Sequence, residues 1–131
     1  DVASQRTEAD PRVPRLAAIY RSMSGHPQLV AGEGRFCTRL MQAARGALIG
    51  KVGADGVYAV GLRACPGRPA LGMALKVEDG HGVVLETLVC AALRHWQAMP
   101  AGRADLEEPR LLNTMGAVIG RMESLLTFDP S

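Results

Sequence analysis

Apolar residues recur at helical spacing in the first third of the chain. Val13, Leu16 and Tyr20 lie three or four residues apart, which predicts a helix over residues 11–23. The same spacing predicts a second helix over residues 35–45. Segments rich in glycine and proline separate the two runs, so we expect turns between the two helices.

Short apolar runs replace the helical pattern in the middle of the chain. Runs bounded by turn residues predict strands over residues 47–52, 57–62 and 71–77. The pair Asp55-Gly56 lies between the first two runs and is typical of a hairpin, because both residues tolerate a left-handed backbone. We therefore expect three strands that form an antiparallel meander.

The last third of the chain predicts one more helix and a tail. Residues 82–98 are apolar nearly all round, as expected for a helix packed across a sheet, and residues 99–109 resemble a polar linker. The tail over residues 111–120 also has helical spacing, but Asn113 and Gly116 between short apolar runs favour a two-stranded hairpin. The predicted fold class is α+β, with an antiparallel sheet and packed helices.

Composition narrows the class of protein. A 131-residue chain with 47% hydrophobic residues suits one folded domain, and no apolar run approaches the roughly 20 residues that cross a bilayer. The net charge is only +2 and the arginines are scattered, which argues against nucleic acid as a partner. The three cysteines are far apart and predict neither a metal site nor a disulfide pair, so we expect a reducing, cytoplasmic location. Because the chain begins at Asp1, we interpret residues 1–131 as a single domain or as the C-terminal fragment of a longer chain.

Lysine is nearly absent from the chain, so each of its two lysines is a candidate for a functional residue. Arginine supplies every other positive charge, and a guanidinium does not titrate usefully, whereas the amine of Lys51 or Lys76 can. Leu48 and Met73 occupy the positions three residues before them, so the chain contains no Ser-x-x-Lys nucleophile pair.

Lys51 is the stronger candidate for a functional lysine. It lies near the end of a predicted strand between Gly50 and Gly53, and glycine at 53 lets another group approach the backbone closely. An edge-strand lysine that discourages aggregation explains the same pattern, so both interpretations stay open. Lys76 precedes two acidic residues and is interpreted as a solvated charge at the end of a strand.

Three ordered blocks of the chain resemble the C-terminal half of the asparaginase II family, which is related in fold to serine β-lactamases and glutaminases. The blocks are residues 26–36 (HPQLVAGEGRF), 50–58 (GKVGADGVY) and 72–80 (GMALKVEDG), and residues 113–120 (NTMGAVIG) are similar to that family's ending. The resemblance implies a β-lactamase/transpeptidase-like fold and hydrolysis of L-asparagine to L-aspartate and ammonia. It also implies that an upstream half carries the Ser-x-x-Lys motif and a Cys-Ser-Gly-Lys-His motif that helps bind zinc.

The resemblance assigns roles to three residues of this chain. Lys51 would face the serine nucleophile of the upstream half, the backbone N–H of Ala54 would donate to the oxyanion, and Gly53 would keep the strand open to substrate. We expect no cofactor and no metal ligand in these residues, an amide substrate, a homo-oligomer, and no activity from this chain alone. The alternative is a non-catalytic interaction or dimerisation domain derived from this fold.

Overall fold

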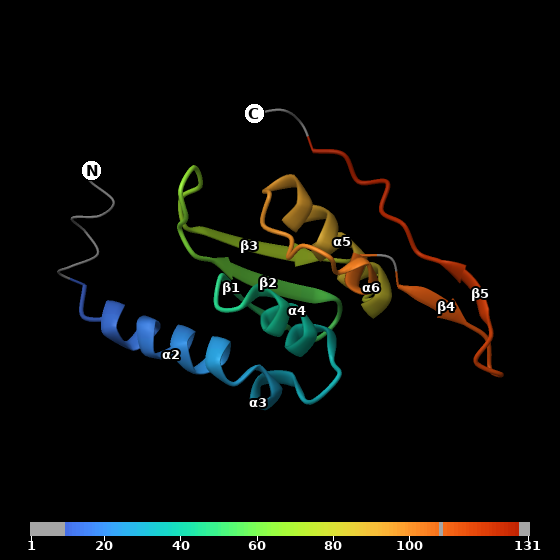
Figure 1. The fold of residues 1–131 in the computed structure, drawn as a ribbon, viewed down its shortest axis with the longest axis horizontal. Coiled ribbons are helices and arrows are strands. Elements are labelled where there is room, and N and C mark those ends of the chain that lie inside the picture. Colours follow the sequence, from blue (N-terminus) through green and yellow to red (C-terminus); the bar gives the residue numbers. More distant parts are fainter. Residues whose placement is uncertain (1–9, 108, 129–131) are drawn as a thin grey trace.

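An antiparallel sheet of three strands lies at the centre of the molecule (Figure 1). The computed structural model describes residues 10–107 and 109–128, and its strands are β1 (Leu48–Val52), β2 (Val57–Leu62) and β3 (Leu71–Lys76). They pair in the order β1-β2-β3, each antiparallel to the next. The predicted meander is confirmed, and the chain is α+β.

The turn between β1 and β2 is built on the predicted Asp55-Gly56 pair. Both residues have positive φ values, 54° and 72°. A Cβ added to Gly56 would lie 2.7 Å from the Cα of Gly80, so glycine is required here by space as well as by backbone angle. The hairpin is thereby packed against the turn that leads into the third predicted helix.

One face of the sheet is buried under two helices. Tyr58, Val60 and Leu62 alternate inward along β2, whereas Val57 and Ala59 on the same strand are exposed. The covering helices are α4 (Phe36–Ala44) and α5 (Gly82–His95). The main core side chains from these helices and from β1 are Phe36, Leu40, Met41, Leu48, Leu85, Val89 and Leu93.

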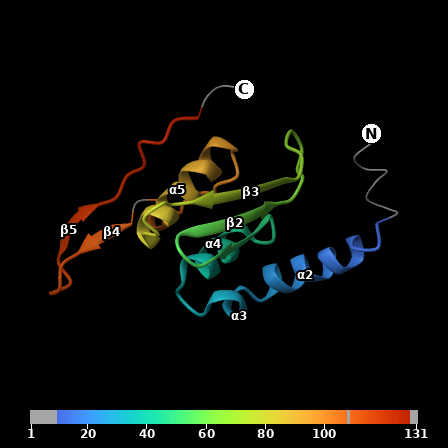
Figure 2. The ribbon, with the colours of Figure 1, turned by 180° about the vertical axis from the view of Figure 1, so that it is seen from behind.

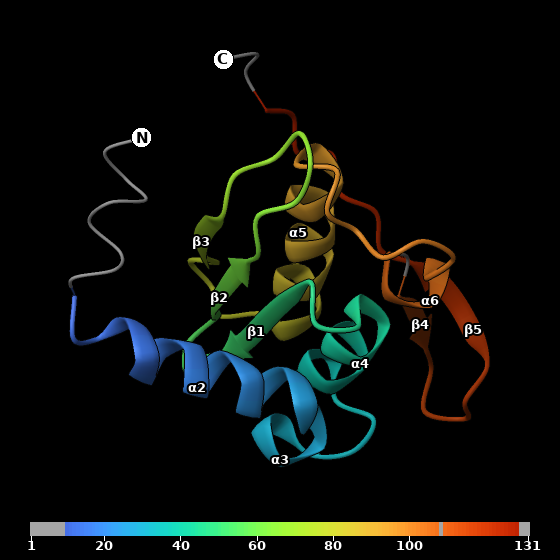
Figure 3. The ribbon, with the colours of Figure 1, turned by 60° about the vertical axis from the view of Figure 1, so that its left-hand side comes forward.

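Helix α2 (Val13–Gly25) confirms the first predicted helix and crosses beside β1, as Figure 3 shows. None of its residues is buried. Tyr20 attaches it: the hydroxyl donates a 3.1 Å hydrogen bond to the carbonyl of Gly46, and the Arg63 guanidinium lies 5.7 Å from the ring centre. A short helix, α3 (Pro27–Ala31), follows where the sequence predicted only a turn, because proline is tolerated in the first turn of a helix.

Residues 99–109 contain a docked helix, so their interpretation as a polar linker was wrong. In α6 (Ala104–Glu107) the Leu106 side chain is only 2% exposed and joins the main core. Asp105 accepts a 2.6 Å bond from Arg39 on α4 and a 2.7 Å bond from Arg103. A four-residue helix leaves no periodic signal, and its burial depends on α4 and α5.

The tail forms the predicted hairpin, β4 (Arg110–Leu112) and β5 (Val118–Arg121). The Asn113 side chain accepts hydrogen bonds from the backbone N–H groups of Met115 and Ala117, which holds the turn. The chain after β5 then runs back beside α5, as Figure 2 shows. Residues 122–126 line a groove together with α5, and the Phe128 ring stacks on the His95 ring with 4.2 Å between ring centres. This second contact explains why α5 is apolar nearly all round. Within the described residues, no helix has the length and apolar character of a membrane span.

Candidate functional site

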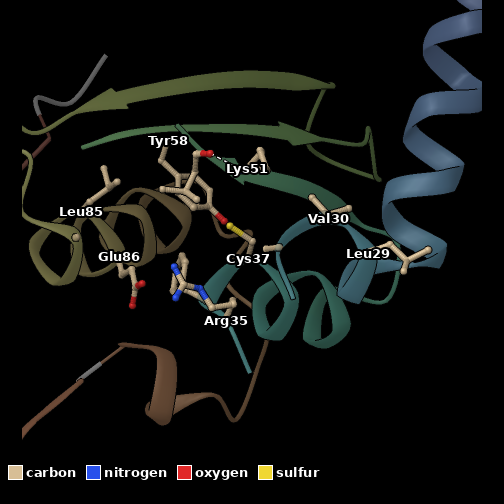
Figure 4. Close-up of a pocket in the computed structure, with 12 residues that line it drawn as sticks. Leu29, Val30, Arg35, Cys37, Lys51, Tyr58, Leu85 and Glu86 are labelled. Atoms are coloured by element: carbon tan, nitrogen blue, oxygen red, sulfur yellow. Dashed lines mark hydrogen bonds between the residues drawn. The ribbon is translucent and has the colours of Figure 1, made fainter. Parts of the chain in front are cut away.

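A cavity of about 390 Å³ opens where the end of β1 meets α3, the start of α4 and the first turns of α5. Figure 4 shows the side chains that enclose it. Its polar lining consists of Arg35, Cys37, Lys51, Tyr58 and Glu86, and its apolar lining includes Val30, Val52 and Leu85. A volume of this size lies near the lower end of the roughly 300–1,000 Å³ typical of small-molecule sites.

Lys51 is the one predicted site residue that lines the cavity. Its side chain is exposed, and its ammonium donates a 2.6 Å hydrogen bond to the carbonyl of Val52. The N–H of the same peptide unit, on Gly53, donates to Val57 in β2, so the Val52 carbonyl points away from β2. The Lys51 ammonium therefore lies at the unpaired edge of the sheet, beside the cavity.

Gly53 and Ala54 lie in the hairpin that follows β1, outside the cavity lining. The Gly53 N–H is occupied by its 2.7 Å bond to the Val57 carbonyl, and a Cβ at residue 53 would meet the Val57 Cβ at 3.3 Å. The Ala54 N–H has no hydrogen-bond acceptor among the residues that the structure describes. Lys76, at the end of β3, contacts this hairpin and does not line the cavity, because its ammonium donates a hydrogen bond to the Asp55 carbonyl.

Tyr58 is a site residue that sequence reasoning missed. Its side chain is 1% exposed, its hydroxyl faces the Cys37 sulfur in Figure 4, and that hydroxyl has no hydrogen-bond partner in the described structure. Burial, reinforced by the neighbouring Cys37, raises the pKa of the phenol, so the hydroxyl stays protonated at neutral pH. A buried tyrosine normally pairs its hydroxyl, and this one leaves a donor in the cavity wall.

Arg35 and Glu86 were also missed. Arg35 lies at the N-cap of α4 without capping it through its side chain, and Glu86 lies half-buried on α5. Burial raises the pKa of Glu86, while the charges of Arg39 and Arg35 act in the opposite direction. Arg35 and Glu86 both line the cavity yet form no direct ion pair. Glu86 is the single acidic residue in the apolar run 82–98, and that isolation is the sequence signal that could have found it.

The described residues offer no evident metal centre. They bring together no group of three or more His, Cys, Asp or Glu side chains. Cys37 and Cys90 are buried free thiols, Cys65 is an exposed one, and burial raises the pKa of Cys90 to about 12.

The family model for L-asparaginase II matches residues 1–124 of the chain. The match extends over the helices, the three-stranded sheet, the cavity residues and the tail hairpin. No curated protein matches the chain. The resemblance inferred from the sequence blocks is confirmed.

Proposed function

Because the chain belongs to the L-asparaginase II family, we propose that it forms part of an amidohydrolase that converts L-asparagine to L-aspartate and ammonia. The observation that carries this proposal is the family match over residues 1–124, within which Lys51 presents its ammonium at the free edge of β1 beside a small polar cavity. Family membership supports an asparaginase-type hydrolase, and the residue roles below are our proposal.

Amide hydrolysis needs a nucleophile, a proton for the leaving nitrogen and donors for the developing oxyanion. In our proposal Lys51 exchanges protons with the nucleophile and stabilises its charge. The cavity lining holds no serine or threonine, and its nucleophilic groups are the Cys37 thiol and the Tyr58 phenol, both buried. We therefore assign the nucleophile to a Ser-x-x-Lys segment supplied by an upstream half.

The hairpin after β1 supplies the oxyanion donor in this scheme. The Ala54 N–H is available because no described residue accepts its hydrogen bond, whereas the Gly53 N–H is already bonded to Val57. In this scheme Gly53 leaves the approach to the strand open because it has no side chain. A Cβ at this position would also crowd the Val57 side chain of the hairpin, at 3.3 Å from its Cβ.

We extend the proposal to the fold, the location and the oligomeric state of the complete protein. The antiparallel sheet with helices on one face supports a β-lactamase/transpeptidase-like fold, which an upstream half would complete. The free thiols support a cytoplasmic location, and the exposed face of the sheet supports assembly with a second copy.

A non-catalytic interaction domain is the second candidate function, and exposed apolar side chains favour it. Leu16 and Ile19 on α2 and Val118 and Ile119 on β5 are all more than half exposed. The two pairs lie at opposite ends of the molecule (Figure 1), and exposed apolar patches of this kind are typical of interaction sites.

Ammonia release from L-asparagine distinguishes the two candidates. We expect none from the 131-residue chain alone, and release when a polypeptide carrying the family's Ser-x-x-Lys segment is added or fused upstream. Release by the isolated chain that is lost in Lys51→Ala would overturn the assignment of the nucleophile to another segment. If neither preparation releases ammonia and the chain sediments as a stable dimer, the interaction domain would be favoured.

A further inference from the structure

The proposed reaction leaves two charged groups of the cavity unused. Arg35 and Glu86 come from different helices, α4 and α5, and both line the cavity that Lys51 borders. Neither side chain forms a hydrogen bond with another described residue, and the two side chains form no ion pair with each other. Their opposite charges face a common space, as Figure 4 shows.

The half-buried carboxylate of Glu86, which has no direct cationic partner among the described residues, favours binding of a cationic group. Its carboxylate is half-buried, and desolvation is the largest influence on its pKa, so the charged form is costly where it stands. The nearby arginine charges offset this cost without a direct contact. A cationic group that reached the cavity would be held by a partly desolvated carboxylate, where a charged hydrogen bond is strong.

Arg35 supplies the complementary charge. Its guanidinium is exposed, permanently cationic and suited to bidentate contact with a carboxylate. Because its side chain does not cap α4, ligand binding would not compete with the helix for it. The Tyr58 hydroxyl, which faces the Cys37 sulfur and has no hydrogen-bond partner in the described structure, lies in the same wall and adds to its polar character.

We propose that Arg35 and Glu86 form the binding site for the α-carboxylate and the α-ammonium, respectively, of an amino-acid ligand. This inference rests on the proposed function, since it names the groups that hold the substrate's common end while its side-chain amide is directed toward Lys51. One anionic and one cationic partner match a zwitterion, and neither alone would select one. The small volume and the apolar wall of Val30 and Leu85 favour a short side chain.

Three ligands that differ by one charged group test the assignment directly. They are L-asparagine, succinamate, which lacks the α-ammonium, and 3-aminopropanamide, which lacks the α-carboxylate. Each is titrated into the 131-residue chain and followed by ¹H–¹⁵N NMR shifts. Arg35→Met should weaken L-asparagine and succinamate about 10- to 100-fold, as for loss of a charged hydrogen bond, and leave 3-aminopropanamide unchanged. Glu86→Gln should weaken L-asparagine and 3-aminopropanamide similarly and leave succinamate unchanged.

Matched controls separate recognition from general charge effects. Arg21→Met and Glu33→Gln change exposed residues outside the cavity and should leave all three affinities at the wild-type value. The ligand-selective pattern is a readout that a structural defect would not give. Equal weakening of all three ligands by either cavity variant, or no saturable shift from L-asparagine in the wild-type chain, would overturn the site.

Failure of this inference can be told apart from failure of the proposed function. If the completed enzyme releases ammonia while Arg35→Met and Glu86→Gln keep the wild-type KM, the site assignment is wrong and the hydrolase stands. If the three ligands follow the predicted pattern but no ammonia is released by the completed enzyme, the binding site stands and the hydrolase is wrong.

Discussion

The Tyr58 hydroxyl occupies the space that a side chain at residue 50 would need. A Cβ added to Gly50 would lie 2.7 Å from the hydroxyl oxygen and 3.0 Å from a ring carbon. The Tyr58 ring also packs edge-on against the Phe36 ring, with a centre-to-centre distance of 5.6 Å. Glycine at 50 therefore allows β1 to pass the aromatic wall of the cavity.

Substitution of Gly50 should accordingly destabilise the fold. We expect Gly50→Ala to lower the free energy of unfolding by about 1–3 kcal/mol, the usual cost of overpacking a core. Gly72→Ala is the matched control, because that strand glycine is exposed and an added Cβ would meet nothing within 4 Å. Urea unfolding measures both variants, and equal stability for the two would contradict the steric role of Gly50.

Lys51 should be required for turnover in the enzyme completed by its nucleophile segment. We expect Lys51→Met to lower kcat about 10²- to 10⁴-fold, the range for a positioned acid–base group. Lys51→Arg should not restore it, because a guanidinium stays charged and does not replace a compact ammonium.

Lys76→Met is the control for that measurement. Its ammonium bonds the Asp55 carbonyl away from the cavity, so kcat should change less than tenfold. Circular dichroism should be unchanged in all three lysine variants. Near-normal kcat in a folded Lys51→Met enzyme would contradict the catalytic assignment and favour the interpretation of Lys51 as an edge-strand lysine that discourages aggregation.

The buried Tyr58 should make the protein sensitive to alkali. Its pKa is raised in the folded state above the value of about 10 in an unfolded chain. The neutral phenol therefore contributes stability fully below pH 10, and this contribution is lost as the pH rises further. Tyr58→Phe should unfold at a higher pH than the wild type in an alkaline titration.

At neutral pH the same variant should be as stable as the wild type or more so, because it removes a buried hydroxyl that has no partner. Comparing the two proteins at each pH cancels the contribution of Cys90, whose pKa is also raised. A Tyr58→Phe protein whose stability falls in parallel with the wild type above pH 10 would contradict this assignment.

Helix α6 should be held by its apolar contact more than by its ion pairs. We expect Leu106→Ala to cost about 2–5 kcal/mol, since this leucine is buried in the main core. Asp105→Asn should cost below about 1 kcal/mol, because its pairs with Arg39 and Arg103 are exposed to solvent. Urea unfolding at pH 7 compares the two, and a larger loss in Asp105→Asn would reverse the ranking.

The Asp105 pairs should also give a small acid dependence. Hydrogen bonds from Arg103 and Arg39 lower the pKa of Asp105 below its usual value near 3.8. Its contribution is therefore present above about pH 4 and is lost as the pH falls through the folded pKa. The difference in stability between the wild type and Asp105→Asn should shrink on acidification.

Local pattern determined much of this fold in advance. The three strands, the hairpin at Asp55-Gly56 and the helices over α2, α4 and α5 all follow from spacing and turn chemistry within a few neighbouring residues. The tail hairpin follows in the same way from Asn113 and Gly116. Each of these signals is local, because backbone angles and side-chain periodicity act over a single turn or strand.

Only the tertiary structure decided the short helices and most of the cavity. Helices α3 and α6 are too short for periodicity, and Leu106 is buried only because α4 and α5 cover it. The scarcity of lysine already marked Lys51 in the sequence, but Arg35, Tyr58 and Glu86 lie up to 51 residues apart and no spacing relates them. Packing of α4 and α5 on one face of the sheet brings these three together, so their charges and the unpartnered hydroxyl become a site only when the chain is folded.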